Sequence, residues 1–155
     1  MSIDWTRALM TLKVKPWNEL SRKEINDIFS LRSEVFIVEQ ECAYQDVDGN
    51  DEKADHVLLH VNNELVGYAR VFPKNTYFKE ASFGRAVVKK KDRGEGYGHL
   101  IVDKSLEHLK SKKQSPIKIS AQSYLKEFYA SHGFLAKGDE YMEDGIPHTA
   151  MYLDL

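Results

Sequence analysis

The spacing of hydrophobic residues divides the first part of the chain into a strand and a helix. Residues 11–16 alternate between apolar and polar side chains, which predicts a strand. Ser21 stands three residues before Glu24, and this capping box predicts a helix that starts near Arg22. Apolar residues then recur at helical spacing as far as Val38. A strand followed by an amphipathic helix is therefore expected at this end of the chain.

The middle of the chain predicts a hairpin, a further strand and a second helix. Residues 56–61 and 65–72 are rich in β-forming side chains and flank Asn62-Asn63-Glu64, which favours a tight turn. Residues 81–88 are expected to form the next strand. A glycine-spaced segment follows them and opens into an amphipathic helical pattern that ends before Pro116.

The last third predicts a strand over residues 117–121, a short helix over 123–131, and two strands over 134–142 and 147–153 around a turn. The resulting order, β-α-ββ-β-α-β-α-ββ, predicts an α/β protein (an α+β mixed sheet) with a central mixed β-sheet flanked by helices. No linker, repeat or low-complexity tract interrupts the sequence, so we expect one domain over residues 1–155.

Composition and charge narrow the function classes. Of 155 residues, 42% are hydrophobic and 30% charged, as in soluble globular proteins. The formal net charge of −2 and the isoelectric point near 6.3 argue against a nucleic-acid partner. No apolar run approaches the roughly 20 residues of a membrane span, and no secretory signal pattern is present, so no membrane partner is expected. The single cysteine, Cys42, fits a reducing compartment, and we expect a cytoplasmic protein.

The segment Arg93-Gly94-Glu95-Gly96-Tyr97-Gly98, called the glycine loop below, predicts an anion-binding site. Its glycines let backbone N–H groups approach a bulky anion, and the helix that follows adds its positive dipole end. A nucleotide-binding Walker loop would need Lys and Ser or Thr after its last glycine, where this chain has His99 and Leu100. The spacing also differs from the dinucleotide fingerprint. An ordinary glycine-rich turn is the remaining alternative.

A polar segment over residues 39–51 lacks periodicity and predicts a long loop. Its carboxylates do not form an EF-hand. A calcium loop starting at Asp46 would need glycine at position 51, which is Asp, and one starting at Asp48 would need glycine at position 53, which is Lys. The segment is either a solvated loop or a binding loop. Arg32, beside the apolar stripe of the preceding helix, either extends its charge to solvent, caps carbonyl groups, or belongs to a site.

The glycine loop resembles the R-x-x-G-x-G/A motif of the GNAT N-acetyltransferase superfamily. Residues 128–134, Phe-Tyr-Ala-Ser-His-Gly-Phe, are similar to the F-Y-x-x-x-G-F segment of that superfamily. Residues 31–42 resemble the L-R-x-x-V-F-V-V-E-Q-x-C pattern of its ElaA-type branch, as do residues 44–49 and 141–148. The resemblance extends from about Trp5 to Met151 and implies the GNAT fold.

This resemblance implies an N-acetyltransferase that moves the acetyl group of acetyl-CoA to a primary amine of a small molecule or peptide, by direct transfer in a ternary complex. Acetyl-CoA is the expected co-substrate. No metal is expected, because the histidines show no metal-ligand spacing. The residues implied to bind the cofactor are Ala86, Val87, Val88, Arg93, Gly94, Glu95, Gly96, Tyr97, Gly98 and Tyr129.

The resemblance also implies chemical roles. Tyr129 is expected to protonate the leaving thiolate, and a backbone N–H near Ala86 or Val87 to stabilise the oxyanion. For the base that deprotonates the amine, Glu39 is the first candidate and His148 the second. His56 and Asp144 are lesser candidates, and a structural role is the alternative for each. Residues expected to contact the acceptor are Arg32, Glu39, Gln40 and Tyr44.

Two other functions compete with this prediction. An acetyl-CoA-binding sensor module with little catalysis would share the glycine loop and need neither acid nor base. A homoserine-lactone synthase would share the fold, but the intact glycine loop favours a CoA donor over a carrier protein. The sequence leaves a homodimer open.

Overall fold

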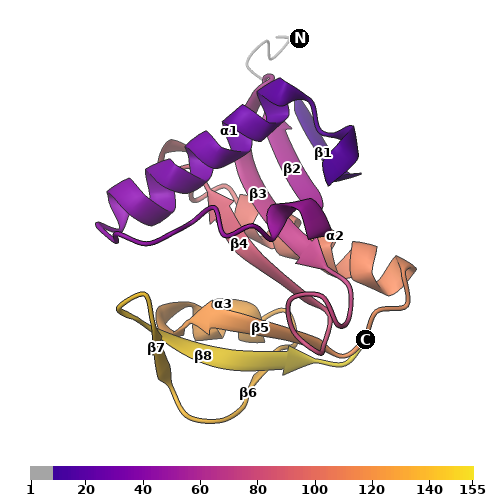
Figure 1. Cartoon of the computed structure of the whole chain (residues 1–155), viewed down its shortest axis with the longest axis vertical. Helices are drawn as coiled ribbons and strands as arrows, with labels where there is room; N and C mark the ends of the chain where they lie inside the picture. Colours follow the sequence, from indigo (N-terminus) through magenta and orange to yellow (C-terminus); the bar gives the residue numbers. More distant parts are fainter. Residues whose placement is uncertain (1–8) are drawn as a thin grey trace, which may run out of the picture.

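The computed structural model describes residues 9–155 (Figure 1). Trp5, where the family resemblance begins, lies outside them. The principal elements are β1 (Met10–Pro16), α1 (Arg22–Arg32), β2 (Asp55–Val61), β3 (Glu64–Phe72), β4 (Ser82–Val88), α2 (Tyr97–Ser111), β5 (Ile117–Gln122), α3 (Lys126–Ala130), β6 (Leu135–Ala136), β7 (Tyr141–Glu143) and β8 (Ile146–Leu153). No helix within residues 9–155 has the length and apolar character needed to cross a membrane.

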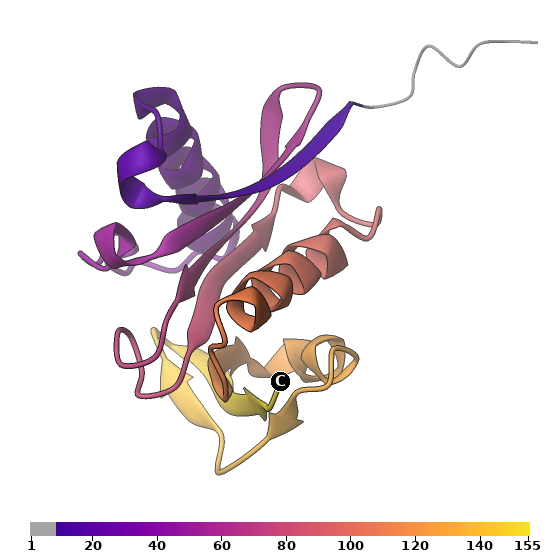
Figure 2. The ribbon, with the colours of Figure 1, turned by 90° about the vertical axis from the view of Figure 1, so that its right-hand side faces the viewer.

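The first sheet has the order β1-β2-β3-β4, and every neighbouring pair is antiparallel. Helices α1 and α2 lie on its opposite faces (Figure 2). Neighbouring residues of β2 accordingly point into two cores: Leu58 packs on the α1 side and Leu59 on the α2 side. Gly67 in β3 lets α2 approach closely, since a Cβ there would lie 3.2 Å from Ile101. The sheet is thus the rigid support from which both helices are positioned.

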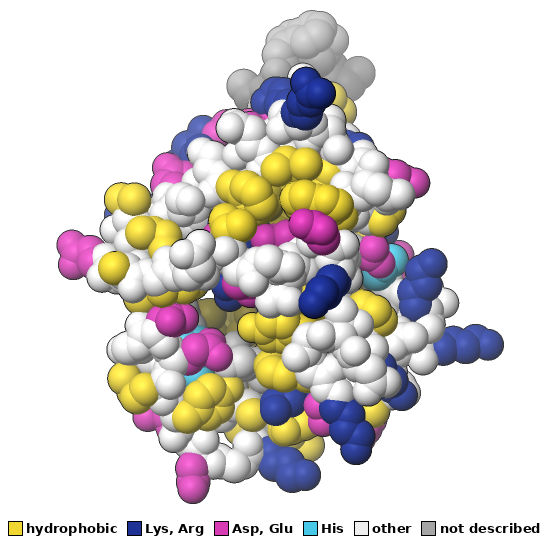
Figure 3. All heavy atoms as spheres, viewed as in Figure 1, with side chains coloured by type: hydrophobic (Ala, Val, Ile, Leu, Met, Phe, Trp, Pro, Cys, Tyr) yellow, Lys and Arg dark blue, Asp and Glu magenta, His cyan; other side chains and the backbone are white. Residues whose placement is uncertain are grey.

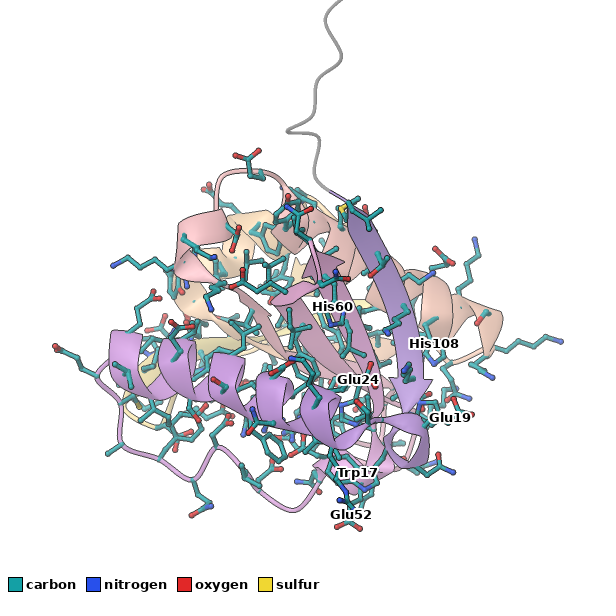
Figure 4. The ribbon with its side chains drawn as sticks, turned by 90° about the horizontal axis from the view of Figure 1, so that it is seen from above. Trp17, Glu19, Glu24, Glu52, His60 and His108 are labelled. Atoms are coloured by element: carbon teal, nitrogen blue, oxygen red, sulfur yellow. The ribbon has the colours of Figure 1, made fainter. Side chains whose placement is uncertain are left out.

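The predicted capping box is confirmed at the start of α1. The Ser21 hydroxyl accepts from the Glu24 N–H at 3.0 Å, and the Ser21 N–H donates to Glu24 Oε1 at 2.9 Å. Figure 4 shows Glu24 on α1 beside strand β1, where Lys13 and Lys15 reach its carboxylate. Burial alone would raise the pKa of Glu24, but the hydrogen bonds from Ser21, Lys15 and Lys13 lower it to about 2. Sequence-local capping therefore also anchors α1 to β1.

Helical structure continues beyond α1 as a π-helical segment, η2 (Ser33–Glu39). The sequence predicts that Val38 continues the apolar stripe, but Val38 is 70% exposed. The wider π-helical winding changes the angle between successive side chains, so the 3.6-residue spacing no longer applies here. As a result, η2 carries its last residues toward the opening between the two sheets.

The second sheet contains β5, β8 and β6 in that order, with β7 also paired to β8, all antiparallel. The strand predicted over residues 134–142 is wrong as a single element. It is divided into β6 and β7, and the φ of +86° at Gly138 between them turns the chain away from an extended course. The predicted turn before β8 is confirmed, with positive φ at Asp144 and Gly145.

The two sheets meet at one parallel bridge, between Ala81 and Ile117. Beyond it β4 and β5 do not pair, and the sheets separate (Figure 1). The single central sheet expected from the sequence is therefore two antiparallel sheets joined at one point. Because this parallel bridge joins strands that otherwise pair antiparallel, the predicted fold class, an α+β mixed sheet flanked by helices, is confirmed. The separation of β4 from β5 creates the space in which the site lies.

Candidate functional site

A cavity of about 630 Å³ lies between the diverging strands β4 and β5. Its walls come from these strands, the end of η2, the glycine loop with the first turn of α2, α3, and the β7–β8 turn. In the space-filling view a hollow opens left of the centre of the molecule, with acidic side chains and a histidine gathered beside it (Figure 3). Its size suits a small-molecule ligand.

The β4 wall contains a bulge. Tyr68 pairs with Val87 and Arg70 with Gly84, so that two residues of β4, Arg85 and Ala86, stand opposite Ala69 alone. The φ of Arg85 is +50°, as expected for a distorted strand position. The extra residue of a bulge is left out of the ladder of strand hydrogen bonds. Backbone donors near Ala86 are thus available to a ligand in the cavity.

The glycine loop opens the same cavity toward α2. Gly94 and Gly96 have φ of +89° and +80°, conformations that favour glycine, and a Cβ at either position would meet nothing within 4 Å. Helix α2 starts directly after Gly96, which provides no side-chain cap. The first N–H groups of a helix have no partner within the helix. The open loop and the uncapped helix together form a binding site suited to a phosphate group.

Arg93, predicted to bind the cofactor, and Glu39, predicted as a base, form an ion pair in the cavity wall. Arg93 Nη1 and Nη2 donate to the two carboxylate oxygens of Glu39 at 2.7 and 2.9 Å. Arg93 Nε also donates to the Val88 carbonyl at 3.0 Å. The hydrogen bond with Arg93 lowers the pKa of Glu39 against the effect of burial. Glu39 is therefore held as an ionised carboxylate with both oxygens occupied.

Tyr129 lies in the cavity wall on α3 and is 8% exposed. Its ring packs against the rings of Phe83, Phe128 and Phe134. Burial raises the pKa of Tyr129 to about 12. The side chain is therefore a neutral phenol at physiological pH and keeps a proton that it can donate.

The second sheet contributes four side chains from three of its strands to the cavity region. We call them the His148 cluster: Ser120, Tyr141, Glu143 and His148. His148 Nδ1 lies 2.7 Å from the Ile146 carbonyl, and Nε2 lies 3.2 Å from Glu143 Oε2. The Ser120 hydroxyl lies 2.5 Å from the Tyr141 hydroxyl and 3.3 Å from Glu143 Oε1. Ser120, Glu143 and His148 line the cavity.

Two contacts join η2 and the segment after it to the second sheet. The side-chain amides of Gln40 and Gln122 bond to each other at 3.3 Å, and Cys42 Sγ donates to the Asp144 carbonyl at 3.1 Å. Tyr44 also lines the cavity, with its hydroxyl donating to Asp46 at 3.0 Å. The predicted residues Glu39, Gln40, Tyr44 and Asp144 are thus brought into one wall.

Arg32, by contrast, is absent from the cavity lining and has no solvent exposure. It belongs to a group that we call the arginine–aspartate network: Arg32, Arg70, Arg85, Asp46, Asp48 and Asp51. All of these are buried except Arg85 and Asp48, which are partly exposed. Arg32 Nε lies 2.9 Å from Asp46 and Nη1 lies 2.6 Å from Asp51. Arg70 donates to both oxygens of Asp48, at 2.8 and 2.7 Å. Asp46, Asp48 and Asp51 thus hold the polar segment against the first sheet, whereas Glu41 of the same segment is exposed.

His56 also lies outside the cavity lining and is fully buried. Its Nε2 lies 2.9 Å from the Asp51 carbonyl and its Nδ1 2.6 Å from the Tyr68 hydroxyl. Because a carbonyl oxygen accepts, Nε2 carries the proton and Nδ1 accepts from Tyr68. Burial lowers the pKa of His56. These contacts are those of a structural histidine that supports the arginine–aspartate network.

Sequence reasoning missed Glu143, Ser120 and Tyr141. Ser120 is far from His148 in sequence and is brought near it by the pairing of β5 with β8, in which Gln122 lies opposite His148. Tyr141 lies opposite His148 within the β7–β8 hairpin. The turn sequence before Pro147 offered one usable signal, because a two-residue hairpin places Glu143 directly opposite Ile146. Across residues 9–155 no group of three or more His, Cys, Asp or Glu side chains is placed to hold a metal ion.

Comparison with known proteins places these features in a family. The family model described as "Acetyltransferase (GNAT) domain" matches residues 18–155. Protein ElaA of Escherichia coli is 40% identical over 140 residues, which cover 86% of this chain and 90% of ElaA. In the ElaA crystal structure the similarity covers 93% of this chain and 99% of that one, with a TM-score of 0.86 and 35% identity.

Two further structures extend the comparison. An acyl-CoA N-acyltransferase from Pseudomonas aeruginosa has a TM-score of 0.86 and 32% identity, over 92% of this chain and 98% of that one. The AHL synthase LasI has a TM-score of 0.76 at 13% identity, over 95% of this chain and 90% of its own. At that identity the likeness to LasI is one of fold alone.

Proposed function

Because the chain belongs to the GNAT acetyltransferase family and is an acyltransferase, we propose that it moves the acetyl group of acetyl-CoA to a primary amine. The acceptor amine belongs to a small molecule or a peptide, and transfer is direct, within a ternary complex. One observation carries the proposal: the open glycine loop, the β4 bulge and the buried phenol of Tyr129 border one cavity.

In this proposal the glycine loop binds the pyrophosphate of acetyl-CoA. The uncapped first turn of α2 and the space in front of Gly94 and Gly96 support that position. The thioester then lies beside residues 86–88 of β4. A backbone N–H near Ala86 or Val87 stabilises the oxyanion, an interaction worth about 3 kcal/mol in comparable sites.

Tyr129 is the proposed general acid, because burial keeps its proton on the phenol until a thiolate forms beside it. The base is either Glu39 or His148, both of which line the cavity. Glu39, Gln40 and Tyr44 are the proposed acceptor contacts. Arg32 has no part in the proposal, since its guanidinium is buried between aspartates away from the cavity.

The proposal is tested by measuring CoA thiol release from acetyl-CoA with a panel of primary amines. Tyr129→Phe should lower kcat by about 10²-fold, the contribution typical of a general acid, and leave acetyl-CoA affinity nearly unchanged. Tyr152→Phe is the matched control, because Tyr152 lies on β8 beside Lys118 and Lys137, outside the cavity lining. Acetyl-CoA binding without turnover of any amine would support the sensor module instead.

A further inference from the structure

We propose that His148 and Glu143 act together as the proton-accepting pair of this site, positioned by Ser120 and Tyr141. The acceptor class follows from this assignment: alkyl amines, which reach the cavity as ammonium ions. The inference rests on the proposed acetyl transfer and adds to it the base and the charge state of the acceptor.

The hydrogen bonds of His148 define which nitrogen takes up a proton. A carbonyl oxygen only accepts, so Nδ1, 2.7 Å from the Ile146 carbonyl, carries the proton of the neutral ring. The lone pair of the neutral ring is then on Nε2, the nitrogen on the side of Glu143. The ring has a fixed tautomer, and its one lone pair faces Glu143 Oε2 at 3.2 Å, so a proton taken up at Nε2 lies between the histidine and the carboxylate.

Glu143 is suited to stabilise the imidazolium that forms. Within residues 9–155 no Lys or Arg nitrogen lies within 4.0 Å of its carboxylate, and His148 Nε2 is its ion-pair partner at 3.2 Å. Its other oxygen lies 3.3 Å from the Ser120 hydroxyl, which is bonded to Tyr141. The Tyr141 ring stacks on the His148 ring at 6.2 Å between centroids. Ser120 and Tyr141 therefore hold Glu143 and His148 in position.

Contact with a cation counts against Glu39 as the base. Both of its oxygens accept from Arg93, and the ion pair lowers its pKa. A proton could reach Glu39 only after Arg93 had moved. His148 Nε2 instead faces an acceptor, the Glu143 carboxylate, so it can take up a proton while this contact is kept. Its side chain is 8% exposed, which limits competition from bulk water.

The proton balance of the reaction is complete with these groups. The ammonium gives one proton to His148 Nε2, and the free amine attacks the thioester carbon to form the C–N bond. The C–S bond breaks, and the thiolate takes the proton of Tyr129. The phenolate recovers a proton from the nitrogen of the new amide through water. The imidazolium then releases its proton to solvent, so that each turnover yields acetylated amine, CoA thiol and one proton.

Other polar and charged groups also lie around His148. Tyr141 and Glu143 come from β7, Asp144 from the adjoining turn, and Tyr124 from the helical turn that packs on β8. Cys42, which contacts the Asp144 carbonyl, and the Glu39–Arg93 pair also line the cavity. Among these groups, Glu143 is the carboxylate in contact with the His148 ring. Replacing Glu143 therefore tests the His148–Glu143 pair separately from the other groups.

The test compares two acceptors that differ in charge: a primary alkyl amine, protonated at pH 7 because its pKa is near 10, and hydroxylamine, whose nitrogen is largely unprotonated there. Hydroxylamine needs no base before it attacks. His148→Gln should lower kcat/KM by about 10²-fold with the alkyl amine and by less than about threefold with hydroxylamine. His108→Gln is the matched control, because His108 pairs with Asp55 outside the cavity lining and should change neither rate.

The ratio of the two rates gives a readout that a structural role would not move. Glu143→Gln should lower kcat/KM more with the alkyl amine than with hydroxylamine, because only the alkyl ammonium must give up a proton before it attacks. Equal loss with both acceptors in His148→Gln, or no loss with either, would overturn the inference. Wild-type turnover of hydroxylamine alone would retain acetyl transfer and reject the base, whereas no turnover of either acceptor would reject both proposals.

Discussion

Two acidic stretches of this chain have opposite environments. The aspartates of the segment at residues 46–51 each meet an arginine of the arginine–aspartate network, and Asp46 and Asp51 are buried there. Glu143 and Asp144, on the β7–β8 turn, have no Lys or Arg nitrogen within 4.0 Å among residues 9–155. The first stretch is enclosed by protein and the second borders the cavity.

The difference shows how the protein separates stability from chemistry. Buried charges require partners, because an unpaired ion in a poorly solvated position is costly. The arginine–aspartate network satisfies this requirement and orders the segment that carries Tyr44. A carboxylate at the cavity without a permanent cation remains available for a ligand or a proton. Variants of the arginine–aspartate network should therefore lose much more stability than variants of the β7–β8 turn.

The largest effect on stability is expected for Arg32→Met. The replacement keeps much of the side-chain volume but leaves Asp46 and Asp51 without their shared partner, which should cost about 3–5 kcal/mol in the free energy of unfolding. Urea denaturation measures this change. In the control, Lys23→Met, an exposed pair with Asp27 is lost, and about 0.5 kcal/mol or less is expected. Similar losses in the two variants would contradict the role of the network.

Acidification should destabilise the same region next. Burial lowers the pKa of His56 in the folded protein, so the unfolded chain binds its proton first as the pH falls below about 6.5. Stability should therefore decrease from that pH downward, by up to about 1 kcal/mol over the first pH unit from His56. His56→Gln should remove this part of the slope. The pKa of His60 is also lowered by burial, so His60 contributes equally to the pH dependence of stability in wild type and in His56→Gln. An unchanged slope would show that His56 is not held neutral.

A smaller effect is expected for Glu39→Gln. The ion pair with Arg93 is partly solvated, since Arg93 is 40% exposed, so its loss should change the free energy of unfolding by less than about 1 kcal/mol. Arg93 then becomes free to bind a phosphate, and acetyl-CoA affinity should rise a few-fold, as calorimetric titration can detect. Weaker acetyl-CoA binding in this variant would contradict the idea that Glu39 competes for Arg93.

The smallest stability effect is expected for Glu143→Gln. Its side chain is 46% exposed, and its partners are a hydroxyl and a histidine, so about 0.5 kcal/mol or less should be lost. Urea denaturation beside Arg32→Met gives the direct comparison. A loss as large as that of Arg32→Met would make Glu143 a structural residue and erase the contrast between the two stretches.

Local rules predicted most of the fold. The capping box at Ser21, the Asn62-Asn63 turn and the glycine-to-helix transition at Gly96 each depend on residues close in sequence, and each is confirmed. The GNAT family predicted from the motifs is confirmed as well. The π-helical continuation of α1 was missed because its apolar residues also fit ordinary helical spacing as far as Val38.

Long-range pairing decided what the sequence could not. Asp46, Asp48 and Asp51 meet Arg70 and Arg85 only because β3 and β4 pass beneath the segment that carries them. The contact of Glu39 with Arg93 joins residues 54 positions apart, and that of Cys42 with Asp144 joins residues 102 positions apart. No periodicity reports such contacts. The roles predicted for Tyr129, His148 and the glycine loop stay predictions, now supported by their meeting in one cavity.

The central claim, that the glycine loop binds acetyl-CoA, is tested most directly by a thermal-shift titration of wild type, Gly96→Trp and Gly138→Trp. Both glycines have positive φ and open space around the missing Cβ, but Gly138 lies outside the cavity lining. At 100 times its dissociation constant, acetyl-CoA should stabilise wild type and Gly138→Trp by about 2.7 kcal/mol and should not stabilise Gly96→Trp. No shift in wild type, or an equal shift in Gly96→Trp, would contradict the claim.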